Sequence, residues 1–277
     1  MRVEKLLVVT DLDATLLDSN YQWKEAIAVV ERLYDLGFPL VFNSSKTIAE
    51  MRDLSEEMKN ISPMVAENGG AVAIPKNSAT ETDPRIADRP AYEVSVNGIS
   101  RAEICKIAHE LRERENFSFE GFSDWTVAEL QERTGLTLSQ AENAREREAT
   151  EPIIWLDKED RWSLFEQELS NHGIRILRGG RFRHLMGEHD KADGLRLVRD
   201  LYVKAEPETK WTTVALGDSQ NDIKMLEAAD IAVVIPSLHG TVLEPKTAQV
   251  VVAQHLGPKG WSTSMNEIID DTLRTLS

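Results

Sequence analysis

The chain has 277 residues, and its 32 basic and 47 acidic residues give a formal net charge of −15 at pH 7. This length suits one large or two moderate domains, and the acidity disfavours a general role on nucleic acid or anionic lipid, whose surfaces attract basic patches. The single cysteine, Cys105, allows no intramolecular disulfide, and without a signal-peptide pattern or an apolar run near the roughly 20 residues of a membrane-spanning helix we expect a cytoplasmic protein.

The first third of the chain alternates between strand and helix patterns. The run Leu6–Thr10 is continuously apolar and β-branched, which is typical of a strand buried on both faces of a parallel sheet. A helix over Trp23–Leu36 follows, and then a second strand at Pro39–Asn43. We predict a second helix that starts near Ile48 and a third strand at Pro63–Ala66. This alternation with short links predicts a doubly wound α/β layer.

After residue 70 the character of the sequence changes. Residues Ala71–Arg85 indicate a hairpin or loop, and the polar, proline-containing stretch Asn77–Pro90 indicates a domain boundary. The strands expected next are Tyr92–Val96, Ile153–Leu156, Ile174–Leu177 and Phe182–Met186. The helices expected among them are Ala102–Glu115, Thr126–Arg133, Leu138–Glu148 and Trp162–Asn171. We therefore expect an inserted α/β domain over residues 85–187.

The α/β rhythm resumes in the last third. The elements expected there are a helix over Ala192–Val203, strands over Thr213–Leu216, Ile231–Ile235 and Gln249–Val252, and a closing helix over Trp261–Leu276. Together with residues 1–84, residues 188–277 then form a parallel-sheet core that the inserted domain interrupts.

Two aspartates follow the first predicted strand. In open α/β sheets ligands bind beyond the carboxyl ends of the strands, so Asp11 and Asp13 can converge on one site there. Two carboxylates that lie close together repel each other, and a divalent cation between them relieves the repulsion. Magnesium prefers such oxygen ligands together with substrate phosphate. The alternative is a pair of loop aspartates that only cap a turn.

Three further segments carry polar residues at strand or helix ends. Gly217–Asp222 follows another buried strand, so Asp218 and Asp222 complete an acidic cluster if that strand neighbours the first. The turn Ser44–Thr47 offers hydroxyls and helix-opening amides to a phosphate. Lys191 opens a later helix. Taken singly, each has an ordinary explanation as a helix cap, a turn or a solvated lysine.

The order of these features resembles the haloacid dehalogenase superfamily over essentially the whole chain. An Asp-x-Asp-x-Thr motif, a hydroxyl after the second strand, a helix-opening lysine and Gly-Asp-x-x-x-Asp follow one another as in that superfamily. The insertion after the third strand resembles the α/β cap of its sugar-phosphatase branch. The resemblance implies an α/β fold, a doubly wound parallel-sheet core with an inserted α/β cap domain.

The resemblance also implies a role for each motif residue. Asp11 is expected to be the nucleophile that becomes an aspartyl-phosphate, and Asp13 the general acid and then base. Ser44 and Lys191 are expected to hold the phosphoryl oxygens. The residues expected to bind magnesium are Asp11, Asp13 and Asp218, and those expected to support the site are Thr15, Asn221 and Asp222.

One position departs from the superfamily pattern, because many relatives carry glycine where this chain has Ala14. Alanine adopts a positive φ only at an energetic cost. We therefore expect a right-handed turn after Asp13, or else a strained site.

Several segments resemble a narrower group, the mannosyl-3-phosphoglycerate phosphatases. They are Asn43–Thr47, Ala66–Gly69, Gly180–His184 and Gly257–Trp261. Such enzymes release phosphate and mannosylglycerate from a small substrate that carries both a phosphate and a carboxylate. The residues expected to contact it are Ser45, Lys46, Asn68, Arg181 and His184, of which the two cap residues alternatively belong to a polar edge strand.

Other functions remain open from the residues alone. A glucosyl analogue or a broader range of sugar phosphates is an alternative substrate. Nucleotide-sugar glycosyltransferases also use Asp-x-Asp, but they leave Lys191, Thr15 and Gly217–Asp222 without a role. A phospho-accepting receiver domain lacks the large insertion. A scaffold that binds a phosphorylated ligand without turnover is a further alternative, and the sequence does not indicate an oligomeric state.

Overall fold

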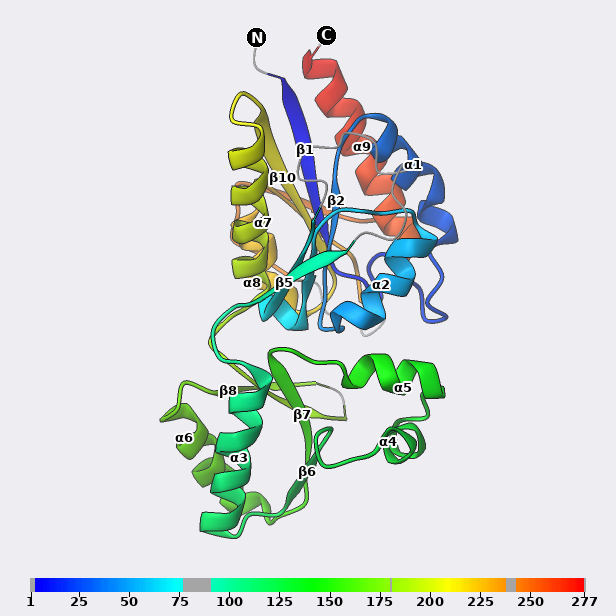
Figure 1. Cartoon of the computed structure of the whole chain (residues 1–277). Helices are drawn as coiled ribbons and strands as arrows, with labels where there is room; N and C mark the ends of the chain where they lie inside the picture. Colours follow the sequence, from blue (N-terminus) through cyan, green and yellow to red (C-terminus); the bar gives the residue numbers. More distant parts are fainter. Residues whose placement is uncertain (1–2, 77–90, 180, 238–242, 277) are drawn as a thin grey trace.

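The computed structural model describes residues 3–76, 91–179, 181–237 and 243–276. They form a core domain and a smaller cap domain that lies beyond one end of the core sheet (Figure 1). In this part of the chain no helix is long and apolar enough to cross a membrane.

The core is built on a mixed sheet of eight described strands. Their order is β12-β11-β10-β1-β2-β3-β4-β5, with β1 at the centre. The strands are β1 (Glu4–Thr10), β2 (Leu40–Asn43), β3 (Met64–Ala66), β4 (Ala71–Pro75), β5 (Tyr92–Val96), β10 (Lys210–Gly217), β11 (Ile231–Val234) and β12 (Gln249–Val252). The pairs among β12, β11, β10, β1, β2 and β3 are parallel, whereas β4 and β5 run antiparallel to their neighbours. The doubly wound α/β core is therefore confirmed.

Helices cover both faces of this sheet, as Figure 1 shows. On one face lie η1 (Lys24–Ala26), α1 (Ile27–Asp35), α2 (Ile48–Glu57) and α9 (Gly257–Leu276), and on the other α7 (Lys191–Ala205) and α8 (Ile223–Ala228). Side chains of β1 alternate between the two layers, with Leu6 and Val8 in one apolar cluster and Leu7 and Val9 in the other. This double burial explains why the strand is apolar without alternation.

The cap has an antiparallel sheet in the order β6-β7-β9-β8. Its strands are β6 (Phe119–Gly121), β7 (Thr150–Trp155), β8 (Arg175–Arg178) and β9 (Arg183–Met186). Its helices are α3 (Arg101–Glu115), α4 (Val127–Thr134), α5 (Leu138–Arg145) and α6 (Trp162–Ser170), with η3 (Glu159–Arg161) before α6. Trp162 is buried with α3 and α6, and Trp125 is buried with α4 and α5. These two tryptophans thus belong to the cap interior.

One predicted cap strand lies elsewhere. Tyr92–Val96, which we expected in the inserted domain, pairs with β4 as the edge of the core sheet. Its alternating polar and apolar residues fit a half-exposed edge strand in either domain, so the pattern alone did not place it. The expected boundary at residues 84–85 and the stretch 77–90 lie outside the described residues. Among the described residues, the chain passes into the cap after β5.

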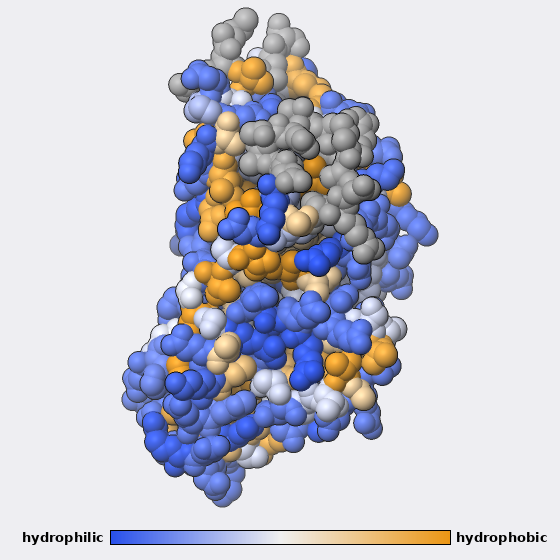
Figure 2. Space-filling model, in the orientation of Figure 1, coloured by the Kyte–Doolittle hydropathy of each residue, from blue (hydrophilic) through white to orange (hydrophobic). Residues whose placement is uncertain are grey.

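The two domains are in direct contact beyond their covalent links. Thr47 Oγ1 at the start of α2 donates a hydrogen bond to the Asn143 carbonyl of α5 at 2.8 Å, and Asn143 Nδ2 donates one to Asp53 at 3.1 Å. On the face seen in Figure 2 the cap is mostly hydrophilic, whereas hydrophobic residues gather in a band across the core. The cap is therefore placed over the core by polar contacts.

Candidate active site

The strand register brings the predicted motifs to one edge of the core sheet. Thr10, the last residue of β1, is aligned with Leu216 of β10 on one side and with Phe42 of β2 on the other. Asp11 therefore follows its strand level with the ends of β2 and β10, which lead into Ser44 and Asp218 respectively. This edge faces the cap in Figure 1, so a ligand here lies between the two domains.

A buried lysine joins two of the carboxylates. Lys191 Nζ lies 2.6 Å from Asp11 Oδ1 and 2.6 Å from Asp222 Oδ1, and all three side chains are almost fully shielded from water. Lys191 is the first residue of α7, whose N-cap Asp190 accepts hydrogen bonds from the Ala192 and Asp193 amides. The N-cap residue fixes where α7 starts, and therefore where the Lys191 side chain enters the site.

The acidic cluster carries more negative charge than its surroundings neutralise. Asp11, Asp218 and Asp222 each offer a carboxylate oxygen, and these oxygens lie within 4.8 Å of one another. Burial raises the pKa of Asp11 to about 7 although Lys191 opposes the shift. Burial and the charge of Asp222 raise the pKa of Asp218 to about 6. Oxygen donors that resist ionisation in a buried site fit a hard divalent cation, which favours their charged form.

The surrounding hydrogen bonds hold this cluster in place. Asp222 Oδ2 accepts hydrogen bonds from the backbone amides of Asp218 at 3.1 Å and Ser219 at 3.0 Å. Thr15 Oγ1 donates to Asp218 Oδ1 at 3.3 Å. Asn221 Nδ2 donates to Asn68 Oδ1 at 3.1 Å. Because both oxygens of Asp222 are occupied, Asp222 is better suited to orient the site than to bind a cation directly.

The predicted phosphate loop forms the next part of the same edge. Ser44 is buried at the end of β2, and its carbonyl accepts a hydrogen bond from the Asn68 amide at 2.9 Å. Thr47 caps α2 through a reciprocal pair of hydrogen bonds with Glu50. Ser45 and Lys46 lie between these anchors. The loop is therefore fixed from both ends, which suits a segment that positions a phosphate.

Asp13 lies apart from the acidic cluster. Its carboxylate is 47% exposed and Oδ1 lies 3.0 Å from Lys46 Nζ. The group of carboxylates that can share a cation includes Asp222 instead of Asp13. The expectation that Asp13 binds magnesium together with Asp11 and Asp218 thus gains no support from this arrangement of the carboxylates.

The turn after Asp13 is left-handed, since Ala14 has φ of 57°. The expectation of a right-handed turn is wrong, and the alternative, a strained residue beside the site, is what the structure has. A positive φ costs a residue with a Cβ of order 1–3 kcal/mol. Hydrogen bonds from the Thr15 and Leu17 amides to the Leu12 carbonyl enforce the turn.

The two predicted cap residues have different surroundings. Arg181 donates a hydrogen bond to the Arg133 carbonyl at 2.5 Å on the cap surface. Burial, with a contribution from Arg147, lowers the pKa of His184 to about 3, so its imidazole is neutral at physiological pH. A neutral ring offers no charge to a carboxylate. Lys46, by contrast, forms an ion pair with the motif residue Asp13.

Two residues at the junction of cap and core were not predicted. Glu67 is fully buried and its carboxylate accepts hydrogen bonds from the Glu148 amide at 2.6 Å and from Thr150 Oγ1 at 2.6 Å. Arg147 lies 3.5 Å from Glu67 and donates to the Ser45 carbonyl at 3.1 Å. Arg147 was not recognised from the sequence because it lies in a run of charged residues, and such runs usually form solvated helix faces.

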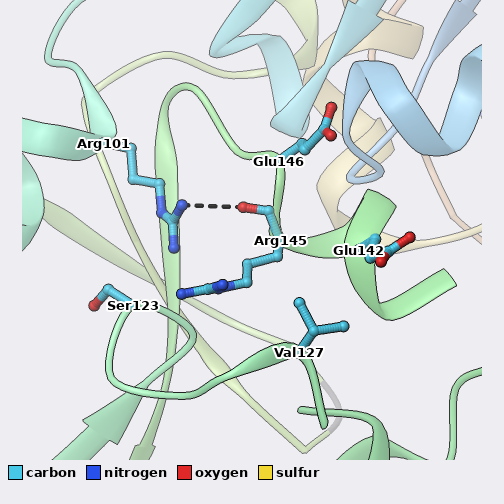
Figure 3. A pocket seen from close by; sticks show the side chains of 6 residues that line it. All are labelled: Arg101, Ser123, Val127, Glu142, Arg145 and Glu146. Atoms are coloured by element: carbon cyan, nitrogen blue, oxygen red, sulfur yellow. Dashed lines mark hydrogen bonds between the residues drawn. The ribbon is translucent and has the colours of Figure 1, made fainter. Parts of the chain in front are cut away.

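The cap also has a polar cavity of about 440 Å³ that contains none of the predicted site residues. It is lined by Arg101, Ser123, Val127, Glu142, Arg145 and Glu146. In Figure 3 the Arg145 side chain extends toward Arg101 and Ser123, and Arg101 Nη1 donates to the Arg145 carbonyl at 3.0 Å. Nearby, burial raises the pKa of the Cys105 thiol to about 11, which argues against a nucleophilic role.

The chain is similar to known proteins over nearly its whole length. A family model described as haloacid dehalogenase-like hydrolase matches residues 8–250. A glucosyl-3-phosphoglycerate/mannosyl-3-phosphoglycerate phosphatase from Persephonella marina is 33% identical over 97% of this chain and 99% of its own. A phosphatase of the same name from Methanococcoides burtonii is 30% identical over 96% of this chain and 97% of its own. A solved structure from Thermoplasma acidophilum has a TM-score of 0.65 at 17% identity, covering 96% of this chain and 98% of that one.

Proposed function

This chain belongs to the haloacid dehalogenase-like hydrolases and is a phosphatase, and we propose that it removes the phosphate from a glycosyl-3-phosphoglycerate through an aspartyl-phosphate on Asp11. The observation that carries the proposed mechanism is the buried group of Asp11, Lys191 and Asp222 at the cap-facing edge of the sheet. A carboxylate held by a buried ammonium is oriented for attack without being free to rotate.

The reaction then proceeds in two transfers. The Asp11 carboxylate attacks phosphorus, the bond to the ester oxygen breaks, and Asp13 gives its proton to the departing alkoxide. In the second transfer Asp13 takes a proton from water, which attacks the aspartyl-phosphate and releases inorganic phosphate. Lys191 and Ser44 stabilise the charge on the phosphoryl oxygens in both steps. The exposed position of Asp13 fits this role, because its carboxylate must reach both alcohol and water.

Magnesium is part of the proposal. Asp11 and Asp218 would hold the ion, while Asp222, fixed by the Asp218 and Ser219 amides, orients this shell. When bound, magnesium neutralises phosphate charge and relieves the repulsion between the buried carboxylates. The raised pKa values of Asp11 and Asp218 support this assignment, since burial disfavours their ionised forms and a bound cation would oppose that effect.

The substrate class rests on two observations. The two relatives are named as phosphatases of glucosyl- and mannosyl-3-phosphoglycerate. In addition, Lys46 lies 3.0 Å from Asp13, where the leaving alcohol must sit, and offers a cation to the glycerate carboxylate. A cytoplasmic location belongs to the same proposal, because the single cysteine needs no oxidising compartment.

The test is phosphate release from a panel of esters with magnesium and after chelation. The panel contains mannosyl-3-phosphoglycerate, glucosyl-3-phosphoglycerate, 3-phosphoglycerate and hexose phosphates. We expect selective turnover of the glycosylated glycerates, lost on chelation and lowered about 10³-fold or more by Asp11→Asn. Asp271→Asn, on the exposed end of α9, is the control.

Turnover of hexose phosphates alone would keep the mechanism and remove the proposed substrate class. Turnover that survives Asp11→Asn would overturn the aspartyl-phosphate. A folded, magnesium-loaded protein that releases phosphate from none of these esters would instead favour a scaffold that binds a phosphorylated ligand.

A further inference from the structure

An exposed tyrosine in the loop between β1 and η1 lies beside Lys46, the partner of the proposed general acid. Tyr21 is 58% exposed and its backbone is left-handed, with φ of 57°. In Figure 1 this part of the chain, at the blue end of the colour range, lies at the end of the core that faces the cap. A side chain with a Cβ reaches this conformation only at a cost of order 1–3 kcal/mol, and such strained residues cluster at functional sites.

The loop around Tyr21 is closed by hydrogen bonds. Asp18 Oδ1 accepts hydrogen bonds from the backbone amides of Asn20 at 2.7 Å and Gln22 at 2.9 Å. The Tyr21 amide donates to the Asp18 carbonyl at 3.0 Å, and the Asp18 amide donates to the Gln22 carbonyl at 2.9 Å. These bonds form a closed turn that holds an aromatic ring out of the hydrophobic core.

The ring is linked to the catalytic residues by one contact. Lys46 Nζ lies 4.8 Å from the centroid of the Tyr21 ring and 3.0 Å from Asp13 Oδ1. A cation over a tyrosine face is a favourable pair, but it needs only one face of the ring. The remaining exposed surface of Tyr21 is therefore available to another group beside Asp13.

We propose that Tyr21 and Lys46 form the subsite for the leaving alcohol, in which the Tyr21 ring carries the glycosyl ring and Lys46 binds the glycerate carboxylate. The inference rests on the proposed function, because it takes Asp13 as the residue that protonates the ester oxygen. That oxygen must lie against Asp13, so the alcohol it belongs to extends toward the neighbours of Asp13, which are Lys46 and then Tyr21. Aromatic rings combine an apolar face with a polar edge, which suits a sugar ring.

The experiment measures binding separately from turnover. In an Asp11→Asn background, calorimetry gives the affinities of mannosyl-3-phosphoglycerate and of 3-phosphoglycerate, which lacks the sugar. Tyr21→Asn removes the ring with a residue that tolerates a positive φ, and Tyr21→Phe keeps it. Leu164→Asn, which removes an exposed apolar side chain from α6 of the cap, is the control.

We expect Tyr21→Asn to weaken binding of the glycosylated ester about tenfold more than binding of 3-phosphoglycerate, and Tyr21→Phe to restore the difference. In the active enzyme the same contrast appears in KM. Equal weakening for both ligands would mean that the ring acts only through Lys46, and no weakening would mean that it faces solvent; both results overturn the proposal. Because affinity is read without turnover, failure of the aspartyl-phosphate mechanism is recognised independently.

Discussion

At the scale of single residues, Ala14 combines a Cβ with a left-handed backbone. Its left-handed backbone is imposed by the turn that carries Asp13 and Thr15, so the strain sits within the proposed catalytic loop. The loop therefore contains an alanine in a conformation that glycine adopts freely.

We expect Ala14→Gly to stabilise the protein by up to about 1 kcal/mol, because relief of the strained φ exceeds the added freedom of the unfolded chain. Urea unfolding measures the change. Ala14→Val, with a branched Cβ, should destabilise. A loss of stability in Ala14→Gly would show that the methyl group packs favourably enough to offset its backbone cost. Retained phosphatase activity in both the parent and Ala14→Gly would exclude Ala14 as an inactivating change.

His184 is a half-buried residue whose Nδ1 is shielded from water and has no hydrogen-bond partner among the described residues. Its folded-state pKa of about 3 lies below the unfolded value near 6.5. Between these values the unfolded chain binds a proton that the folded chain does not. Stability from this group is therefore complete above pH 6.5 and is lost as the pH falls toward 3.

At pH 5 we expect this linkage to cost about 2 kcal/mol relative to pH 7, and His184→Gln to remove that part of the pH dependence. Denaturant unfolding of the metal-free protein from pH 7.5 to 4.5 measures it. His172→Gln, at an exposed position, is the matched control and leaves the pH profile unchanged. Identical profiles for parent and His184→Gln would mean that His184 is protonated in the folded cap.

At the scale of elements, α7 carries Lys191 into the site, and its distance from the sheet depends on one glycine. A Cβ on Gly194 would lie 2.3 Å from Val65 Cγ1 of β3. Asn43 Nδ2 adds a hydrogen bond of 2.8 Å to the Lys191 carbonyl, which ties the same helix to the end of β2. The close packing of α7 against β3 thus sets the position of the Lys191 side chain in the site.

We expect Gly194→Val to destabilise the protein by about 2 kcal/mol or more and to lower kcat/KM at least about tenfold, since α7 must move away from β3. Val65→Ala in the same chain makes room and recovers part of both losses, which a double-mutant cycle measures. Asp200→Val, on an exposed position of α7, is the control. Full additivity of Gly194→Val and Val65→Ala would contradict this account.

At the scale of the whole molecule, the junction of cap and core is a buried polar array. Glu67 of the core accepts hydrogen bonds from the Glu148 and Ala149 amides of the cap, while Arg147 reaches back to the Ser45 carbonyl of the phosphate loop. Glu67 itself has a positive φ of 53°. The array therefore connects the cap domain directly to the loop that is proposed to hold phosphate.

We expect Glu67→Gln to destabilise the protein by about 2–4 kcal/mol, because an amide nitrogen replaces an acceptor that faces buried donors. Hydrogen exchange should become faster at the Glu148 and Ala149 amides before it does so in β1. The control Glu159→Gln removes an exposed ion pair with Arg183 and should cost less than about 0.5 kcal/mol. Unchanged exchange at both amides would show that the cap is held mainly by the contact between α2 and α5.

Much of the core could be predicted from the sequence, because its strands and motifs can be recognised from short segments of the chain. The apolar runs of β1 and β10 indicate buried strands, and the motifs at their ends lie at one edge of the sheet because the two strands are parallel. The order of Asp11, Ser44, Lys191 and Asp218 along the chain indicated the superfamily before any distance was known.

Only the tertiary structure decided which of these residues meet. The position of Tyr92–Val96 in the core sheet, the pairing of Asp13 with Lys46 and the neutral state of His184 depend on neighbours far away in sequence. The same holds for Glu67, whose carboxylate binds residues about 80 positions later. Local composition records propensity and burial pattern, whereas partners and pKa values are set by packing between distant segments, which no single stretch of sequence contains.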